Sequence, residues 1–358
     1  MQDTDKPGLF GLKHSNRDFE LKETWGKNQF NSSFPAALSA YLCHKGFENV
    51  YLTLNDKLKV VHKKIATSDI LGISPTSDNL FYAFKSTFSP YQQLVIGHLP
   101  RVDLVTQGRD TGKCLKGVEI KLTALPDHTT CAFLSEERYG TEIVIRPDTI
   151  VYLACSIVNH YKNEPKKLQN WIDSFFDNIK DWTEAESVLP FIPSMIVAID
   201  KIALDLLDVQ EPIIMQPIWK TEGKSPRLSE YCLDVFVWSN LAFTQLFIDV
   251  AREEVKGNKI TRQVRTIVWL FKMLYDFSRN GQINHTKIID ELSFNTKNDK
   301  AFAVSGRITQ PYMTCDELTN PRISKTQIKE IILGGGQNLL SPERRFDAII
   351  FNSPELFT

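Results

Sequence analysis

One short run of alternating residues constrains this chain more than any other feature. Positions 118 to 122 read Val-Glu-Ile-Lys-Leu, in which apolar and charged residues alternate strictly. On a β-strand, successive side chains point to opposite faces. Glu119 and Lys121 therefore share one face, while the three apolar residues pack on the core from the other. The run predicts a sheet that carries a carboxylate and an ammonium side by side.

The preceding segment supplies a second acid. Residues 101–106 also have the pattern of a strand, and Asp103 lies in it between Val102 and Leu104. The polar residues 108–113 predict a turn, so that 101–106 and 114–122 would form a β-hairpin. Such a hairpin brings Asp103 beside Glu119.

Asp103, Glu119 and Lys121 are the residue types that hydrolysis of a phosphodiester requires. A metal ion near the phosphate lowers the pKa of a bound water and neutralises the charge that develops on phosphorus. Mg²⁺ is usually held by one or two carboxylates, and a nearby lysine can orient the attacking water. We therefore interpret Asp103 and Glu119 as metal ligands and Lys121 as their catalytic partner. An ordinary salt-bridged surface strand has the same pattern and is the alternative.

The remaining elements are predicted from periodicity and turn residues. Strands are expected at 49–54, 58–62, 141–145 and 346–351, and the first two are joined by a turn at Asn55-Asp56. Helices are expected from Pro35 to about Gly46, around 79–84, from Pro147 to about His160, and at 325–333. The region 165–279 is predicted to be mainly helical, with one apolar stripe at 168–179, a buried helix within 231–250 and another at 260–279. This suggests a division into residues 1–163, which carry the predicted active site, and a mainly helical part at 164–358, packed together as one continuous enzyme.

Composition limits the class of protein. The chain has 42 Lys and Arg against 43 Asp and Glu, which is unlike a basic chromatin protein but leaves DNA binding by one face open. Six cysteines form no C-x-x-C pair, and scattered thiols suit a reducing cytoplasm. No apolar leader or uninterrupted apolar span is found, so we expect no membrane partner.

Two other motifs lead to other functions. His62, Lys64 and Asp69 fit the H-x-K-x4-D pattern of phospholipase D nucleases, in which a histidine attacks phosphorus without a metal. No second copy of that pattern is present, and residues 66–69 look like the start of a helix. The Gly-flanked residues 108–114 resemble a phosphate-binding loop but have the wrong spacing. Arg109 and Lys113 in that turn remain candidate contacts to a DNA phosphate, or simply solvated side chains.

Three segments resemble the HindVP/HgiDI-like type II restriction endonucleases: residues 25–35, Val102-Asp103-Leu104, and above all Gly117 to Asp127. The resemblance covers most of the chain. It implies an α/β fold of the PD-(D/E)xK type, a mixed sheet flanked by helices and elaborated by helices in the C-terminal half. It also implies that Asp103 and Glu119 bind Mg²⁺ and that Lys121 assists the attacking water. Pro100 does not directly precede Asp103, as it would in many such motifs, so Asp110 is an alternative first acid.

The same resemblance implies double-stranded DNA as the substrate and a degenerate palindrome of the GRCGYC type as the target. A palindrome asks for two-fold symmetry in the enzyme, so a homodimer is expected. A cognate DNA methyltransferase would be its functional companion. A repair nuclease of the same fold and a non-catalytic DNA-binding protein are the remaining alternatives.

Overall fold

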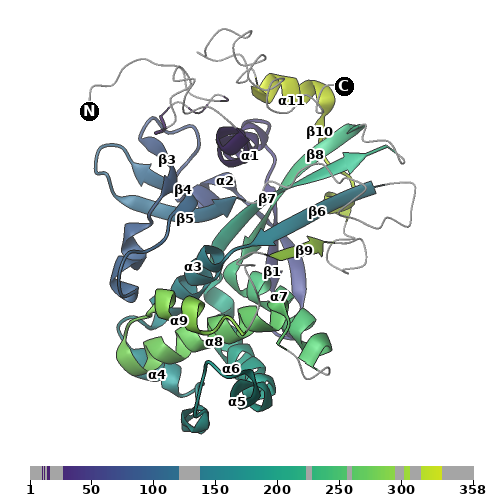
Figure 1. Ribbon diagram of the computed structural model, residues 1–358. Helices are drawn as coiled ribbons and strands as arrows, with labels where there is room; N and C mark the ends of the chain where they lie inside the picture. The colour runs from purple at the N-terminus through teal and green to yellow at the C-terminus, as the bar shows by residue number, and fades with distance from the viewer. Residues whose placement is uncertain are drawn as a thin grey trace.

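A mixed β-sheet forms the middle of the structure (Figure 1). This computed structural model describes residues 10, 12, 14–16, 27–120, 138–222, 228–255, 260–294, 302–306 and 316–332. Seven strands follow one another in the order β2-β1-β8-β7-β5-β4-β3. They are β1 (Asn49–Leu54), β2 (Val60–Ile65), β3 (Leu80–Ser86), β4 (Val102–Gly108), β5 (Cys114–Ile120), β7 (Pro212–Thr221) and β8 (Leu228–Ser239). Off this path lie β6 (Arg138–Ile145), β9 (Phe302–Gly306) and β10 (Ile323–Ser324).

Two parallel pairings join antiparallel units of the sheet. β3, β4 and β5 form one antiparallel unit, and β7 and β8 form another. β5 pairs parallel with β7, and β1 pairs parallel with β8. The predicted hairpin of 101–122 is therefore present as β4 and β5, and its second strand lies inside the sheet with neighbours on both sides.

Helices cover both faces of the sheet. On one face lie α3 (Pro147–Val158), α4 (Pro165–Gln169), α5 (Ala185–Val188), α6 (Ile192–Asp205), α7 (Asn240–Glu254), α8 (Arg262–Asn280) and α9 (His285–Glu291). On the other lie α1 (Lys27–His44), α2 (Thr67–Leu71) and α11 (Lys325–Ile332), and α10 (Asp316–Thr319) precedes β10. Each face has its own buried cluster of apolar side chains. Strand β8 contributes to both clusters, since Phe236 packs on the α3 side and Val235 packs on the α1 side.

Several predicted elements are confirmed. β1 has the predicted bounds, and α3, α8 and α11 begin or end within a few residues of the predicted positions. β2 begins at Val60 and continues to Ile65, later than predicted. The predicted strand at 346–351 lies outside the described residues.

The helix predicted around 79–84 is wrong, because this segment is strand β3. Its aromatic residues Phe81, Tyr82 and Phe84 are typical of strands. All three pair with residues of β4, and Tyr82 and Phe84 fill the core between the sheet and α1. The error matters for the site, because β3 is the strand beside Asp103.

The mainly helical prediction for 165–279 missed β7 and β8. The predicted buried helix within 231–250 is in fact the end of β8 followed by α7, and the Ser239 hydroxyl caps that helix by accepting from the Ala242 amide at 3.0 Å. A strand buried on both faces has a continuous apolar run, which a buried helix shares. The stripe at 168–179 is likewise divided between α4 and a short 3₁₀ helix at Ser174–Asn178.

Helix α1 begins at Lys27, so Pro35 lies inside it and does not open it. An internal proline removes one backbone hydrogen bond and usually bends or ends a helix. Here Phe34 and Leu38 on either side of it are fully buried against the sheet. Tertiary packing of this face offsets the local cost.

The run Ala185–Asp205, which contains α6, is long and apolar enough to cross a membrane by length and composition alone. One such run is weak evidence, since core helices of proteins outside membranes meet the same criterion. In this structure α6 buries Ile192, Met195 and Ile199 in the same cluster as α8. The absence of a membrane partner remains a prediction.

Candidate active site

The two acids predicted from the sequence lie on adjacent strands. β4 and β5 pair antiparallel with Leu104 opposite Val118, and one further step of this register puts Asp103 opposite Glu119. Val118 and Ile120 are buried on the α1 side, as the alternation predicted. Glu119 therefore points to the other face, toward α3.

Backbone amides tie the two carboxylates together. The Asp103 amide donates to Glu119 Oε2 at 3.2 Å, and the Ile120 amide donates to Asp103 Oδ2 at 3.0 Å. Asp103 is only 6% exposed, and Glu119 is half-buried. The arrangement fixes both acids before any ligand arrives.

Lys85 on β3 completes the group from the opposite side. Its ammonium forms an ion pair with Asp103 Oδ1, and its side chain is 45% exposed. Lys85 has a backbone φ of 52°, in the left-handed region that residues other than glycine rarely adopt. Sequence reasoning missed this residue because it placed a helix here. The signal that could have found it is the aromatic, strand-like run just before it.

Helix α3 approaches the acids with its N-terminus. The Thr149 hydroxyl in its first turn donates to Glu119 Oε1 at 3.4 Å. Pro147 occupies the first turn, where its missing N–H costs nothing. The positive end of a helix dipole favours nearby negative charge. The first turn of α3 thus supports Glu119 as a carboxylate.

Tyr152 anchors the segments on either side of the site. Its hydroxyl donates to the Pro100 carbonyl at 2.8 Å and accepts from the Phe88 amide at 3.1 Å. Burial raises the pKa of Tyr152 well above its ordinary value, and the nearby charge of Glu119 acts in the same direction. The hydroxyl therefore stays protonated and holds the start of β4 in place.

The donor set fits a hard divalent cation. Two carboxylates side by side are oxygen ligands of the kind that Mg²⁺ binds through one or two groups while it keeps several waters. Among the described residues, no group of three or more His, Cys, Asp and Glu is placed to hold a metal. Asp103 and Glu119 are therefore the carboxylates of the described residues that could hold a cation here. Lys121 lies outside the described residues, so its role remains a prediction.

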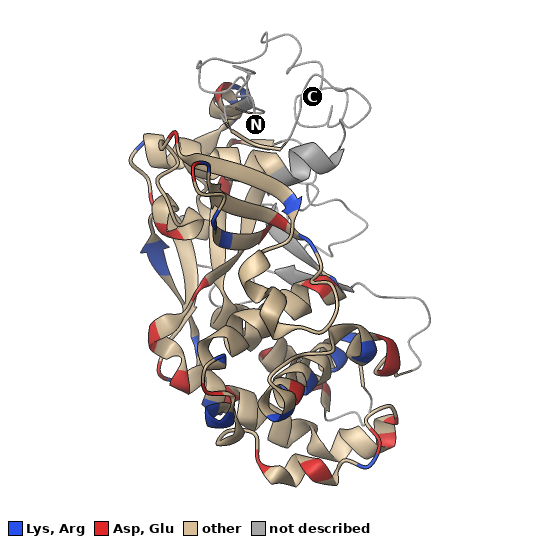
Figure 2. Ribbon diagram, turned by 90° about the vertical axis from the view of Figure 1, so that its left-hand side faces the viewer, with Lys and Arg blue, Asp and Glu red and all other residues tan. Residues whose placement is uncertain are grey.

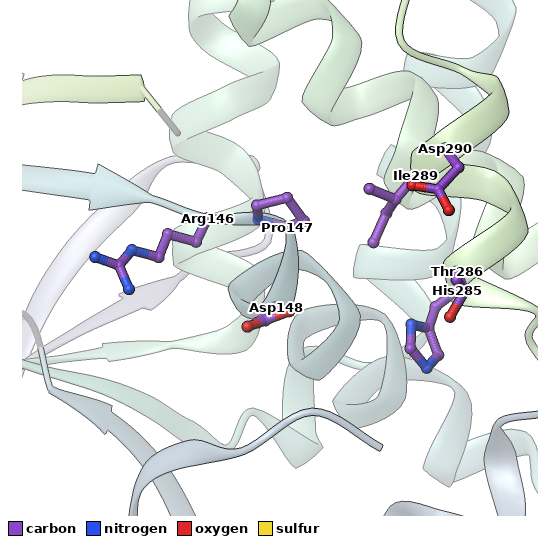
Figure 3. Close-up of a pocket in the computed structure, with 7 residues that line it drawn as sticks. All are labelled: Arg146, Pro147, Asp148, His285, Thr286, Ile289 and Asp290. Atoms are coloured by element: carbon purple, nitrogen blue, oxygen red, sulfur yellow. The ribbon is translucent and has the colours of Figure 1, made fainter. Parts of the chain in front are cut away.

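A pocket of about 400 Å³ opens beside the first turn of α3. Arg146, Pro147 and Asp148 line it from α3 and the residue before it, and His285, Thr286, Ile289 and Asp290 line it from α9 (Figure 3). Arg146 extends away from the α9 side chains. Thr149, which contacts Glu119, follows directly after these residues on α3.

The candidate phosphate contacts lie at the other end of the hairpin. Arg109 and Lys113 are exposed in the turn between β4 and β5, and the Arg109 guanidinium donates to the Asp78 carbonyl at 2.8 Å. Asp103 and this turn are separated by five residues of strand, about 17 Å at 3.3 Å per residue. Asp110 lies in the same turn, so the structure brings Asp103, and not Asp110, beside Glu119.

The residues of the phospholipase D pattern lie far from this site in the sheet. His62 and Lys64 are exposed on β2, at the opposite end of the strand order from β3, and Asp69 is exposed on α2. The helix predicted to begin near residues 66–69 is present as α2.

Charge is distributed without one dominant sign. In Figure 2, Lys and Arg are interspersed with Asp and Glu over the described surface, in agreement with the near-zero net charge of the chain. Two arginines of the helical half have partners within the protein. Arg265 is 2% exposed and lies over the Trp269 ring. Arg322 forms an ion pair with buried Asp234.

Comparison with known proteins gives a consistent result. The profile of the HindVP restriction endonuclease family matches residues 25–357. The type II restriction enzyme HgiDI of Herpetosiphon aurantiacus is 46% identical over 353 residues, which are 99% of this chain and 98% of that protein. The probable type II restriction enzyme HindVP of Haemophilus influenzae is 46% identical over 354 residues, 98% of this chain and 95% of that protein. No solved structure matches the chain. Since both the family profile and these relatives span nearly the full length, the chain belongs to the HindVP restriction endonuclease family.

Proposed function

We propose that this protein is a type II restriction endonuclease that makes sequence-specific double-strand cuts in DNA by Mg²⁺-dependent hydrolysis. Its membership of the family and the names of its relatives support a site-specific deoxyribonuclease. The observation that carries the mechanism is the pair of carboxylates, Asp103 and Glu119, fixed by amides on adjacent strands. We also propose the PD-(D/E)xK fold, which the mixed sheet, the flanking helices and the acids on neighbouring strands support.

The chain's own residues bind and orient the reacting groups. Asp103 and Glu119 would hold Mg²⁺, and Thr149 keeps Glu119 in position. When bound, the metal lowers the pKa of a water and offsets the charge that develops on phosphorus. Lys121, which alternation puts on the same face as Glu119, orients the attacking water. Tyr152 holds the start of β4 and thereby the position of Asp103.

A palindromic target accounts for the proposed assembly. A GRCGYC-type site has two-fold symmetry, so we propose a homodimer with one acid pair for each DNA strand. A cognate methyltransferase would protect the host DNA. We propose a cytoplasmic location, where DNA is accessible and where free thiols, such as those of the four described cysteines, are stable.

The division into residues 1–163 and 164–358 remains a proposal about function. Central strands β7 and β8 come from beyond residue 163, so both parts contribute to one sheet. The helices α6 to α9 would serve DNA binding or dimerisation.

Digestion of plasmid and phage DNA tests the proposal. Wild type should give discrete bands with Mg²⁺ and none with EDTA, and Glu119→Gln should give none in either. Glu186→Gln is the matched control, because Glu186 is exposed on α5. Bands that persist in EDTA would assign the chemistry to His62 and Lys64, and DNA binding without cleavage under any condition would indicate a non-catalytic protein.

A further inference from the structure

Asp103 has a partner that the sequence motif does not contain. One carboxylate oxygen, Oδ2, accepts from the Ile120 amide, while Oδ1 is paired with the Lys85 ammonium. Lys85 comes from β3, on the opposite side of Asp103 from Glu119. The acid pair therefore has a lysine partner on its β3 side.

All three charged groups lie on one face of the sheet. Ala83 on β3 and Val105 on β4 pack in the cluster on the α3 side, and Asp103 lies two residues from Val105 on β4. Lys85 reaches the same side through its ion pair with Asp103 Oδ1. Glu119 points there too, where Thr149 of α3 reaches it. The Lys85 ammonium is thus on the face from which a metal or a phosphate must approach.

The backbone of Lys85 departs from ordinary strand geometry. The register pairs Phe84 with Leu104 and Ser86 with Val102, and Lys85 between them has φ of 52°. Residues held in this region cost free energy and tend to occur at functional sites.

We propose that Lys85 is the counter-ion of the acid pair in the metal-free enzyme and that it transfers to the scissile phosphate when Mg²⁺ binds. This inference rests on the proposed function. Two carboxylates in contact repel each other when both are charged. With no metal bound, the Lys85 ammonium offsets this repulsion by lying against Asp103 Oδ1. The Lys85 ammonium therefore occupies space that a metal cation bound through Asp103 Oδ1 would need.

Metal binding then makes the ion pair unfavourable. A divalent cation held by the acid pair would repel the ammonium, while the two non-bridging oxygens of a DNA phosphate would accept hydrogen bonds from it. The Lys85 side chain is exposed enough to move on its flexible stem. Lys85 is therefore a positioning residue in the free enzyme and a phosphate contact in the loaded one.

The Lys85→Met variant separates this role from a merely structural one. Removing a competing cation should make Ca²⁺ bind about tenfold more tightly to the protein without DNA, measured by calorimetry. Loss of the phosphate contact should lower the cleavage rate at saturating Mg²⁺ on the order of 10²-fold. A structural role would instead weaken both metal affinity and cleavage. Lys85→Arg, which keeps the charge, should stay close to wild type in metal affinity, and Lys63→Met on exposed strand β2 is the matched control.

A measurement on the wild type does not depend on whether the variants fold. Mild amine labelling followed by mass spectrometry should modify Lys85 slowly without metal and at least severalfold faster after Ca²⁺ is added, while Lys63 labelling stays constant. Unchanged labelling of Lys85 together with unchanged Ca²⁺ affinity in Lys85→Met would overturn the proposal. Wild type that neither binds Ca²⁺ nor cleaves DNA would instead refute the proposed function.

Discussion

The carboxylates of Asp103 and Glu119 each accept a hydrogen bond from a backbone amide of the neighbouring strand. The Asp103 amide donates to Glu119, and the amide of the residue after Glu119 donates to Asp103, at 3.2 and 3.0 Å. Each carboxylate thus accepts a hydrogen bond from the backbone of the strand that carries the other acid. The same contacts that align β4 and β5 also position the two carboxylates, so the site is organised by the fold itself.

Substitution of Asp103 should separate charge from hydrogen bonding. Asp103→Asn keeps an oxygen acceptor for the Ile120 amide but loses the charge, so it should abolish Ca²⁺ binding and cleavage with little loss of stability. Asp103→Ala leaves that buried amide without its acceptor and should lower the free energy of unfolding by about 1–3 kcal/mol. Urea unfolding and calorimetry measure the two effects. Equal stability of Asn and Ala variants would show that the hydrogen bond to Ile120 contributes nothing.

Thr149 should affect cleavage more than stability. Thr149→Val has nearly the same shape but cannot donate to Glu119 Oε1. Groups that orient metal ligands typically contribute 10-fold to 100-fold in affinity or activity. We therefore expect a loss of about tenfold in cleavage rate, measured under single-turnover conditions. Thr149→Ser keeps the hydroxyl and should retain most of the activity; equal losses in both variants would assign the effect to packing.

The acid pair could be predicted from sequence because its signal is local. Strict alternation around Glu119 and a strand-like run around Asp103 fix which faces their side chains occupy, and a short turn fixes the pairing. The same local signal does not identify strands buried on both faces. Val235 to Trp238 are all buried in β8, and a continuous apolar run fits a helix equally well.

Lys85 could not be predicted because its position depends on tertiary structure. Its contact with Asp103 requires that β3 pair with β4, and the sequence indicated a helix there. Its left-handed backbone has no sequence signal, since lysine does not favour that region. Thr149 was equally hidden, because only the fold brings the start of α3 to β5.

Loss of the Tyr152 hydroxyl should destabilise the protein to the same extent across the neutral pH range. Tyr152→Phe leaves the Phe88 amide and the Pro100 carbonyl without a partner, which should cost about 1–3 kcal/mol. Burial raises the folded-state pKa of Tyr152 above its ordinary value of 10.0, so the favourable effect of the neutral form is complete below pH 10. Above that, the wild type should lose stability faster than Tyr152→Phe. Urea unfolding at several pH values measures the difference, and a gap that changes between pH 6 and 9 would contradict it.

Arg322 should prove to be a structural residue and not a contact to DNA bases. Its guanidinium contacts both oxygens of Asp234, at 2.7 and 2.9 Å, and Asp234 is only 1% exposed. Breaking a buried ion pair leaves an uncompensated charge and typically lowers the free energy of unfolding by about 3–5 kcal/mol. Because Arg322 is partly exposed, we expect a smaller loss of about 2–3 kcal/mol here. Arg322→Ala should therefore melt earlier yet cut the same sites, whereas Lys329→Ala, an exposed change on α11, should do neither. Altered site preference at full stability would assign Arg322 to base recognition.

Lys113 offers a test of how DNA lies on the hairpin. The turn that carries it is about 17 Å from Asp103 along the strands, which equals about five base pairs of duplex. If DNA runs along β4 and β5 from the acids to this turn, Lys113 neutralises a phosphate outside the cut position. Lys113→Ala should then reduce the salt dependence of DNA binding by about 0.9 in the slope of log K against log salt and leave the cleavage rate of bound DNA unchanged.

Lys57→Ala, in the turn between β1 and β2 at the far end of the sheet, should leave the slope as in wild type. An unaltered slope in Lys113→Ala would mean that this turn is solvated and that the duplex crosses the strands in another direction.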